Sequence, residues 1–367
     1  MRKKRVAILS GLFIVAIAAG VWVFFFWLAP RTSGPLRQDV YVWQRAWTQP
    51  VRDAVSQRAT NFAEIAVLKA EISWSTNRQP QLARVAVDYE TLAKTRRPVG
   101  IALRIGPYAG PFVAGAPSTA SASFPRATNR AEAVLGVPQL ADETPALPGK
   151  DAAITDYICN VAAGIVNEAR TNRVPLAELQ IDFDCAESKL DGYRVWIEAI
   201  QRRVAPVPVT ITALPSWLDS RAFKRLAAVA TNYVLQVHSA ERPRSFDAPF
   251  TLCDPRAAQR AVERAGHIGV PFRVALPTYG YVLAFEPGGK FISLAAEGPR
   301  PNWPTNAQLR TIETDERELA ELVRGWTASR PVALRGVIWY RLPVTTDKHN
   351  WKWEELDAVM RGRASKK

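Results

Sequence analysis

Two aspartates stand two residues apart at the end of an apolar run, in the stretch LQIDFDCAES (residues 179–188). If this stretch forms a strand, alternation places Gln180, Asp182 and Asp184 on one side and the apolar residues on the other. Residues two apart along a strand are separated by about 6.6 Å, because each residue advances the chain by about 3.3 Å. Carboxyl groups about 5–9.5 Å apart flank the scissile bond in sugar-cleaving enzymes. The pair therefore predicts acid–base chemistry on a glycosidic bond.

We expect Asp184 to act as the general acid and Asp182 to tune it. Two like charges in a partly desolvated cleft raise the pKa of one of them, so that a proton donor is available near neutral pH. Glu187 is the third candidate catalytic residue, and it can reach the cleft only if the chain has already turned into a loop. The structural alternative is that one aspartate caps the following helix while the other pairs with an arginine.

Short runs rich in Val and Ile recur along the chain and predict the strands that hold this pair. The eight expected strands span residues 39–47, 64–72, 99–106, 179–185, 207–214, 233–239, 272–280 and 336–342. Most are continuous apolar runs, which is typical of parallel strands buried on both faces. Amphipathic stretches that begin near an aspartate predict helices between them, at residues 151–172, 190–204, 254–269 and 315–329.

Eight strands alternating with helices predict the α/β class and one (β/α)8 TIM barrel over residues 39–360. An open, doubly wound sheet is the alternative, and it usually has fewer strands. Residues 107–150 and 281–314 lack periodicity and are expected to be long loops. Both follow strands, so in a barrel both lie on the face where active sites are built, either as a partial rim around a cleft or as disordered insertions.

The N-terminal residues predict a membrane anchor. A basic tip at residues 1–5 precedes the uncharged residues 6–29, which are numerous enough to cross a hydrocarbon core of about 30 Å as a helix. Residues 30–38 would link this helix to the barrel. Positive charge before the span keeps the N-terminus in the cytoplasm and places the barrel on the other side of the membrane. A cleaved signal peptide is the alternative, because residues 16–18 resemble a small-residue cleavage site.

The net charge of +14 is concentrated at the two ends of the chain. The tip at residues 1–5 contributes four positive charges and the basic tail at residues 361–367 contributes four more, which leaves +6 for the remainder. This mild excess suits an anionic lipid surface or an acidic glycan. It is too weak to predict nucleic acid as a partner.

Cysteine and histidine usage predicts neither a disulfide scaffold nor a metal centre. The three cysteines permit one bridge at most, and the sequence does not indicate which pair among Cys159, Cys185 and Cys253 would form it. The histidines His238, His267 and His349 are not spaced as zinc ligands, either with one another or with the cysteines. We therefore expect no cofactor.

Aromatic and polar side chains at other strand ends are suited to holding a sugar. Aromatic faces pack against the apolar face of a pyranose ring, while neighbouring polar groups bind its hydroxyls. The predicted substrate-binding residues are Trp43, Arg45, Arg104, His238, Tyr279, Tyr281 and Trp339. A core tryptophan or a hydrogen-bonded structural histidine is the alternative for individual members of this set.

The stretch LQIDFDCA resembles the fourth-strand signature of family 18 glycoside hydrolases, Asp-x-x-Asp-x-Asp-x-Glu. The middle and last aspartates of that signature fall on Asp182 and Asp184. Its first aspartate falls on Leu179, and its terminal glutamate, the acid of that family, falls on Ala186, with Glu187 one position late. Family 18 barrels also carry a tryptophan beneath the sugar on the eighth strand. The resemblance implies this role for Trp339.

The stretches YVWQRAW, LQIDFDCAESKLDGY and GVIWYRLP more closely resemble an uncharacterised bacterial group, domain of unknown function family 3142. The resemblance covers nearly everything after the anchor and implies a barrel related to TIM-barrel glycoside hydrolases, with a polysaccharide or oligosaccharide as partner. In a bacterium, the predicted topology is a single-pass inner-membrane protein with its barrel in the periplasm. The group has no established activity to transfer.

The sequence thus predicts a membrane-anchored glycoside hydrolase-like protein that acts on cell-envelope or extracellular polysaccharide. The alternative is a catalytically inactive barrel that binds a glycan or an envelope or export partner, and Ala186 favours it. A sugar-nucleotide glycosyltransferase that binds metal through Asp-Phe-Asp is disfavoured, because nucleotide sugars are cytoplasmic. A glycan deacetylase is disfavoured because the three histidines are scattered.

Overall fold

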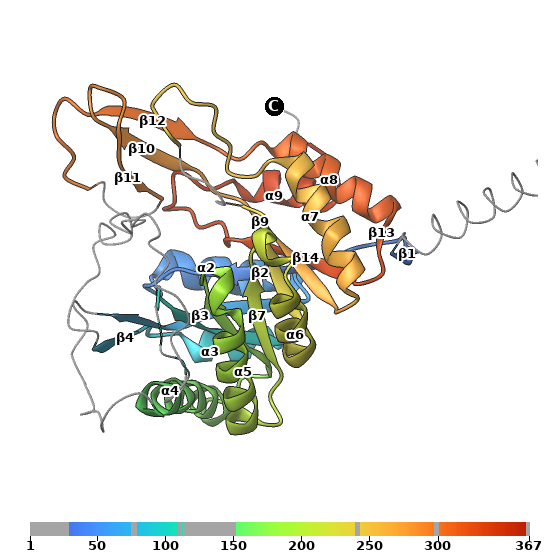
Figure 1. Cartoon of the computed structure of the whole chain (residues 1–367). Coiled ribbons are helices and arrows are strands. Elements are labelled where there is room, and N and C mark those ends of the chain that lie inside the picture. Colours follow the sequence, from blue (N-terminus) through green and yellow to red (C-terminus); the bar gives the residue numbers. More distant parts are fainter. Residues whose placement is uncertain are drawn as a thin grey trace, which may run out of the picture.

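The computed structural model of the chain describes residues 29–74, 79–108, 110, 112, 152–238, 243–296 and 301–364. Eight parallel strands form its centre, and the last pairs with the first, which closes the sheet into a barrel (Figure 1). In chain order they are β2 (Arg37–Val42), β3 (Glu64–Trp74), β5 (Val99–Ile105), β6 (Leu176–Phe183), β7 (Val209–Ala213), β8 (Tyr233–Gln236), β9 (Phe272–Pro277) and β14 (Leu334–Tyr340). The predicted eight-stranded barrel is confirmed, and the open sheet is excluded.

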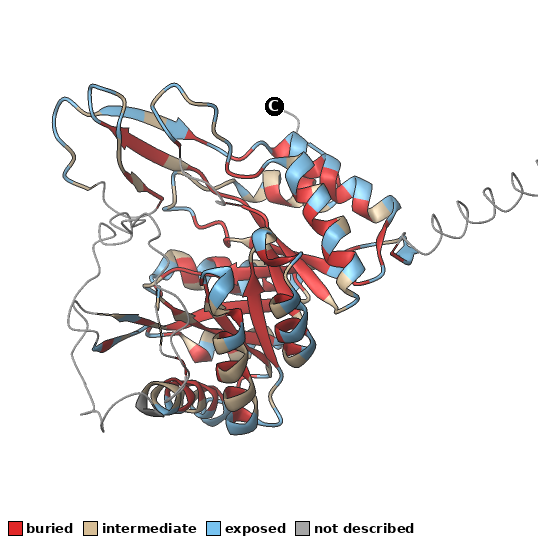
Figure 2. Ribbon diagram, viewed as in Figure 1, coloured by how far each residue is buried: buried red, intermediate tan, exposed pale blue. Residues whose placement is uncertain are grey.

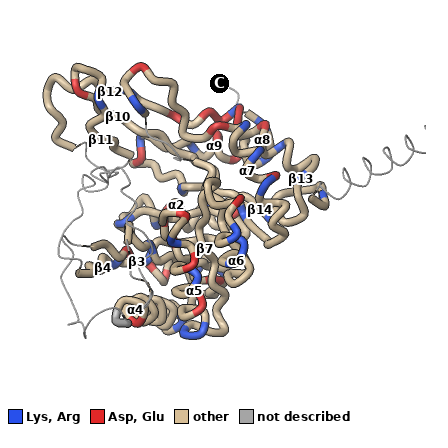
Figure 3. The backbone as a smooth tube through the Cα atoms, in the orientation of Figure 1, with Lys and Arg blue, Asp and Glu red and all other residues tan. Residues whose placement is uncertain are grey.

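Helices lie against the outside of this barrel (Figure 1). They are α2 (Gln49–Arg58), α3 (Tyr89–Thr95), α4 (Ala152–Thr171), α5 (Leu190–Val204), α6 (Arg221–Ala230), α7 (Pro255–Ile268), α8 (Glu316–Ala328) and α9 (Trp353–Met360). The four helices expected from the sequence are α4, α5, α7 and α8, each within one residue at either end. The side chains of Asp254 and Asp315 accept backbone hydrogen bonds at the first turns of α7 and α8, which explains where these two helices begin. Charged residues of both signs are mixed along the outer helices (Figure 3).

Strand β6 shows how alternation serves both the core and the barrel interior. Ile181 and Phe183 are fully buried, and the ring of Phe183 lies 5.1 Å from that of Tyr193 and 5.4 Å from that of Trp196 on α5. Burial of the same kind runs along the other barrel strands and the inner faces of the helices (Figure 2). The polar side chain of Asp182 alternates with these residues and faces the barrel interior. This is the alternation that the sequence predicts.

The connection at residues 281–314, which the sequence predicts to be a loop, contains a small antiparallel sheet. Its strands are β10 (Tyr281–Phe285), β11 (Phe291–Ala295) and β12 (Gln308–Ile312), in the order β11-β10-β12. The sheet projects beyond the end of β9 (Figure 1). Leu283, Phe285 and Ile312 pack with Leu252 and Tyr279 in a second hydrophobic core, and this burial stabilises strands of only five residues each. Glycine and proline residues in the two connections between these strands hide the alternating pattern.

Two further strand pairs extend the fold. Strand β4 (Pro80–Arg84) lies antiparallel to the second half of β3, within a stretch where the sequence pattern is ambiguous. Strand β1 (Arg31–Thr32), in the predicted linker, pairs with β13 (Arg330–Pro331). Short 3-10 turns complete the connections as η1 (Ala59–Asn61), η3 (Glu187–Lys189) and η4 (Pro215–Trp217).

Several predicted segments lie outside the described residues. These are the basic tip, the predicted transmembrane helix except residue 29, nearly all of the predicted loop at residues 107–150, and residues 365–367 of the basic tail. Within the described ranges, no helix combines the length and the apolar character needed to span a bilayer.

A buried cluster of charges occupies the barrel interior near the beginnings of the strands. The Arg273 guanidinium on β9 lies 3.2 Å from a carboxylate oxygen of Asp39 and 3.4 Å from one of Glu64, and it also donates to Glu178. Arg37, which is partly exposed, donates to both Asp39 and Glu64. Three carboxyl groups therefore share two guanidinium groups. Burial, with a further contribution from the Glu178 charge, raises the pKa of Glu64 to about 8, so that this carboxyl is protonated at neutral pH.

Gly100 on β5 makes room for this cluster. A Cβ atom at this position would lie 2.9 Å from a carboxylate oxygen of Glu64 and 3.3 Å from Cγ of Glu178. A larger residue would therefore displace at least one of the two carboxyl groups that the barrel interior has to hold.

Replacing Glu64 with glutamine tests the protonation of this cluster. Because the folded-state pKa of Glu64 is about 8 and its ordinary value is 4.5, its stabilising contribution is fully present below about pH 4.5 and is lost as the pH rises through about 8. We expect wild type to lose free energy of unfolding over this interval, measured by urea titration. Over the same interval, the free energy of unfolding of Glu64→Gln should fall by less than that of wild type. We expect the difference to be at least about 1.4 kcal/mol, the equivalent of one pKa unit. Identical pH profiles for the two proteins would contradict this assignment.

Candidate active site

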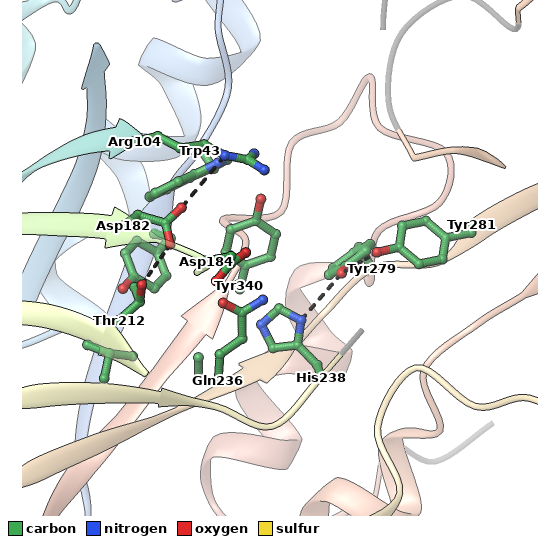
Figure 4. Close-up of a pocket in the computed structure, with 13 residues that line it drawn as sticks. Trp43, Arg104, Asp182, Asp184, Thr212, Gln236, His238, Tyr279, Tyr281 and Tyr340 are labelled. Carbon is green, nitrogen blue, oxygen red and sulfur yellow. Dashed lines mark hydrogen bonds and ion pairs between the residues drawn. The ribbon is translucent and has the colours of Figure 1, made fainter. Parts of the chain in front are cut away.

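A pocket of about 250 Å³ opens at the ends of the barrel strands (Figure 4). Every barrel strand except β3 contributes to it, either from its last residues or from those that follow directly. The residues that line it are Tyr41, Trp43, Arg104, Asp182, Asp184, Thr212, Val234, Gln236, His238, Ala275, Tyr279, Tyr281 and Tyr340. In a barrel of this class, this is the face on which active sites are built.

Asp182 is held by groups from the two strands beside β6. The Thr212 hydroxyl on β7 donates to one carboxylate oxygen at 2.8 Å, and the Arg104 Nε on β5 lies 3.8 Å from the other (Figure 4). Its side chain is only 13% exposed. These contacts fix the orientation of the carboxyl group before any ligand enters the pocket.

Asp184 follows the last residue of β6 on the same side of the chain as Asp182, and it is exposed at the pocket. Below them on this side, Gln180 accepts a hydrogen bond of 2.6 Å from the hydroxyl of Tyr41. The two aspartates therefore share the pocket, as alternation along the strand predicts. Their environments differ, since Asp182 is enclosed and Asp184 is open to solvent.

Glu187, the third predicted catalytic residue, is not among the residues that line this pocket. It is the first residue of η3 and is exposed. The strand ends at Phe183, and the chain then turns into η3 and α5. This turn carries Glu187 past the strand end instead of back into the pocket.

Aromatic rings form one wall of the pocket. The ring centroids of Tyr41 and Trp43 are 5.1 Å apart, and that of Tyr340 lies 5.8 Å from Tyr41 and 5.6 Å from Trp43. Tyr279 continues the wall at 5.5 Å from Tyr340. Such a wall offers flat apolar faces beside the two carboxyl groups, the combination on which sugar rings bind.

Trp339 is not part of this wall. It is fully buried, its indole nitrogen donates to the Gln38 side chain at 2.8 Å, and its ring lies 6.1 Å from that of Trp351. Alternation along β14 points the next residue, Tyr340, into the pocket instead. Trp339 is thus placed in the core and not at the pocket where its predicted sugar contact would be made, whereas Tyr340 lines that pocket.

His238 is buried between aromatic rings. Its ring stacks on Tyr340 with centroids 5.2 Å apart, and its Nδ1 lies 3.4 Å from the hydroxyl of Tyr279, which in turn lies 2.8 Å from that of Tyr281 (Figure 4). Burial lowers the pKa of His238 to about 3. The ring is therefore neutral at physiological pH, which makes it a weak general base and leaves it as a hydrogen-bonding group.

The structure brings most of the predicted site residues together and leaves out three. Those that share the pocket are Asp182, Asp184, Trp43, Arg104, His238, Tyr279 and Tyr281. The three that lie outside the pocket are Glu187, Trp339 and Arg45. The guanidinium of Arg45 instead binds Glu71, to which its Nε and Nη2 donate at 2.6 and 2.8 Å.

Four polar or aromatic pocket residues were not predicted, namely Tyr41, Thr212, Gln236 and Tyr340. Tyr41 and Thr212 could have been found by extending the alternation inward from Trp43 and along β7. Tyr340 follows from the register of β14, which the sequence alone did not set. Within the described residues, no three His, Cys, Asp or Glu side chains converge as metal ligands would, and the three cysteines are buried without disulfide bonds.

Residues 147–345 match the family described as "Domain of unknown function (DUF3142)". The chain belongs to this family. No curated protein matches it in sequence. The description of DUF3142 names no activity.

Solved structures share the fold of this DUF3142 chain. The spore cortex-lytic enzyme SleL of Bacillus cereus is similar with a TM-score of 0.56 and 9% identity, over 91% of this chain and 75% of that one. SleL of Bacillus megaterium QM B1551 gives 0.55 and 12%, over 92% and 76%. A chitinase of Chromobacterium violaceum ATCC 12472 gives 0.55 and 12%, over 89% and 98%. At these identities the similarity establishes a glycoside hydrolase-like barrel fold.

Truncating Trp339 and Tyr340 separately tests the register of β14. Because Trp339 is fully buried, Trp339→Ala is expected to lower the free energy of unfolding by about 3–5 kcal/mol. Tyr340 is less buried and lines the pocket, so Tyr340→Ala is expected to cost clearly less. Chemical denaturation of the two variants provides the comparison. A larger loss for Tyr340→Ala would contradict the register.

Proposed function

We propose that this protein is a membrane-anchored glycoside hydrolase that acts on a cell-envelope or extracellular polysaccharide. The observation that carries the proposal is the pair of carboxyl groups at the mouth of the pocket, one fixed by Thr212 and Arg104 and the other exposed. The aromatic wall beside them supports a sugar ligand. The barrel fold shared with spore cortex-lytic enzymes and a chitinase is in keeping with this chemistry.

The proposed mechanism uses the two aspartates in different roles. Asp184 donates a proton to the glycosidic oxygen as the bond from that oxygen to the anomeric carbon breaks. The carboxylate of Asp182 stabilises the positive charge that develops on the sugar ring. Water then adds to the anomeric carbon and returns a proton to Asp184, which restores the starting state.

The anchor belongs to the same proposal. Residues 6–29 would hold the protein in the bacterial inner membrane, with the barrel on the periplasmic side. An enzyme placed there meets the polysaccharides of the envelope and those in transit across it.

A catalytically inactive barrel that binds a glycan or an envelope or export partner is the second candidate. Ala186 stands where family 18 enzymes carry their acid, and Glu187 does not line the pocket. In this second reading the same aromatic wall binds a sugar, and no bond is cleaved.

Asparagine at position 184 separates the two candidates. We expect Asp184→Asn to lower the release of reducing ends from a panel of envelope glycans by about 10²–10⁴-fold, the usual contribution of a general acid. Glycan binding and thermal stability should change little, because the side chain is exposed and keeps its shape. Tight glycan binding without turnover in wild type, indifferent to this substitution, would favour the inactive barrel.

The charge of the pocket predicts which sugars it accepts. Its charged lining residues within the described chain are Asp182, Asp184 and Arg104, and the arginine is already paired with Glu71 and Asp182. When both aspartates are ionised, the pocket carries a net negative charge, which would repel a uronic acid. We expect neutral oligosaccharides to bind at least about tenfold more tightly than uronate-containing ones of equal length, which corresponds to about 1.4 kcal/mol. Isothermal titration calorimetry measures this ratio, and preference for the acidic sugars would contradict the assignment.

A further inference from the structure

Four side chains of alternating charge cross the ends of adjacent strands and finish at Asp182. The row begins at Arg45, just after β2. Two nitrogens of Arg45 donate to Glu71 on β3, at 2.6 and 2.8 Å. The same glutamate lies 3.9 Å from Nη1 of Arg104 on β5. Arg104 in turn lies 3.8 Å from Asp182 through its Nε. One guanidinium group is thus divided between two carboxylates.

The two halves of the row face different cavities. Arg104 and Asp182 line the candidate active site, whereas Arg45 and Glu71 line a neighbouring pocket of about 510 Å³. A sugar in the active site therefore meets Arg104 and does not meet the outer pair. Glu71 is 18% exposed and Arg45 31%, so that solvent only partly screens their interaction. Arg104 is the group that contacts both Glu71 and Asp182, and it therefore links the outer pair to the active site.

Several of the described side chains around Asp182 are uncharged. Asp184 follows it on the same strand, and Thr212 on β7 is uncharged. Burial raises the pKa values of Tyr41, Tyr193 and Tyr340, which keeps these neighbours neutral. His238 is also neutral, because burial lowers its pKa.

Among the described residues that line the active-site pocket, Arg104 is the sole cation. The place of its guanidinium between Glu71 and Asp182 therefore has a strong influence on the charge of Asp182.

We propose that Arg45 and Glu71 are positioning residues that divide Arg104 between two carboxylates and thereby set the proton affinity of Asp182. Arg45 holds both oxygens of Glu71 and so limits how strongly Glu71 attracts Arg104. The consequence for catalysis rests on the proposed function. The effect on Asp182 does not, because it requires no substrate.

Substitutions in the two outer residues should shift Asp182 in opposite directions. Glu71→Gln removes the competing charge and leaves Arg104 to Asp182, so Asp182 should take up its proton at a lower pH. Arg45→Gln frees Glu71 to attract Arg104, so Asp182 should take up its proton at a higher pH. Because a cation within about 4–6 Å changes a carboxyl pKa by about 1–3 units, we expect each shift to reach about one pH unit.

The experiment is a pH titration of the full chain labelled with ¹³C at the aspartate carboxyl carbons and followed by NMR. Asp182→Asn identifies the Asp182 signal. Arg84→Gln is the matched control, because Arg84 lines the same outer pocket but pairs with Glu168 instead of Glu71. If Arg45→Gln fails to fold, Arg45→Lys takes its place, since it keeps the charge and loses the bidentate contact. A smaller upward shift is then expected.

Opposite shifts with an unmoved Arg84→Gln control would support the proposal. Shifts in the same direction, no shift in either variant, or an equal shift in the control would overturn it. The assay of reducing-end release distinguishes this result from the proposed function. Opposite shifts in a protein that cleaves no glycan would support the positioning role and refute the hydrolase, whereas cleavage with an unmoved Asp182 would do the reverse.

Discussion

Closure of the barrel between β14 and β2 is the constraint on which the site depends. The two strands pair in parallel from Gly336 beside Arg37 to Trp339 beside Val40. A Cβ atom at Gly336 would lie 2.5 Å from the backbone oxygen of Arg37, so this close approach requires glycine. Closure brings Tyr340 against Tyr41, and without it the aromatic wall and the aspartates of β6 would not face one pocket.

The barrel interior holds charge at both ends, with different consequences. Near the strand beginnings, Arg273 is enclosed by Asp39, Glu64 and Glu178, and burial raises the pKa of Glu64. Near the strand ends, the carboxyl groups of Asp182 and Asp184 line the active-site pocket. A hydrogen-bonded path from Glu178 through Gln180 to Tyr41 connects the two layers. The buried cluster is thus linked through Gln180 to Tyr41, which lines the pocket.

Sequence patterns predicted the elements whose physics is local and repetitive. Eight apolar runs located the barrel strands, and alternation placed Asp182 and Asp184 together, because period two leaves no other arrangement within one strand. The same reasoning failed where position depends on distant partners. Strands β10, β11 and β12 belong to a small sheet that packs with Leu252 and Tyr279, and neither of these partners lies within residues 281–314. The choice between Trp339 and Tyr340 required the register of β14 against β2 and β9.

The central claim is that a sugar binds among the aromatic wall and the two aspartates at the strand ends. The most direct measurement is a crystal structure of the Asp184→Asn protein soaked with an oligosaccharide from an envelope glycan. We expect a sugar ring against Tyr340 or Trp43, with a glycosidic oxygen about 2.6–3.2 Å from the side chain at position 184. A sugar bound on the small sheet or in the outer pocket, with the strand-end pocket empty, would contradict it.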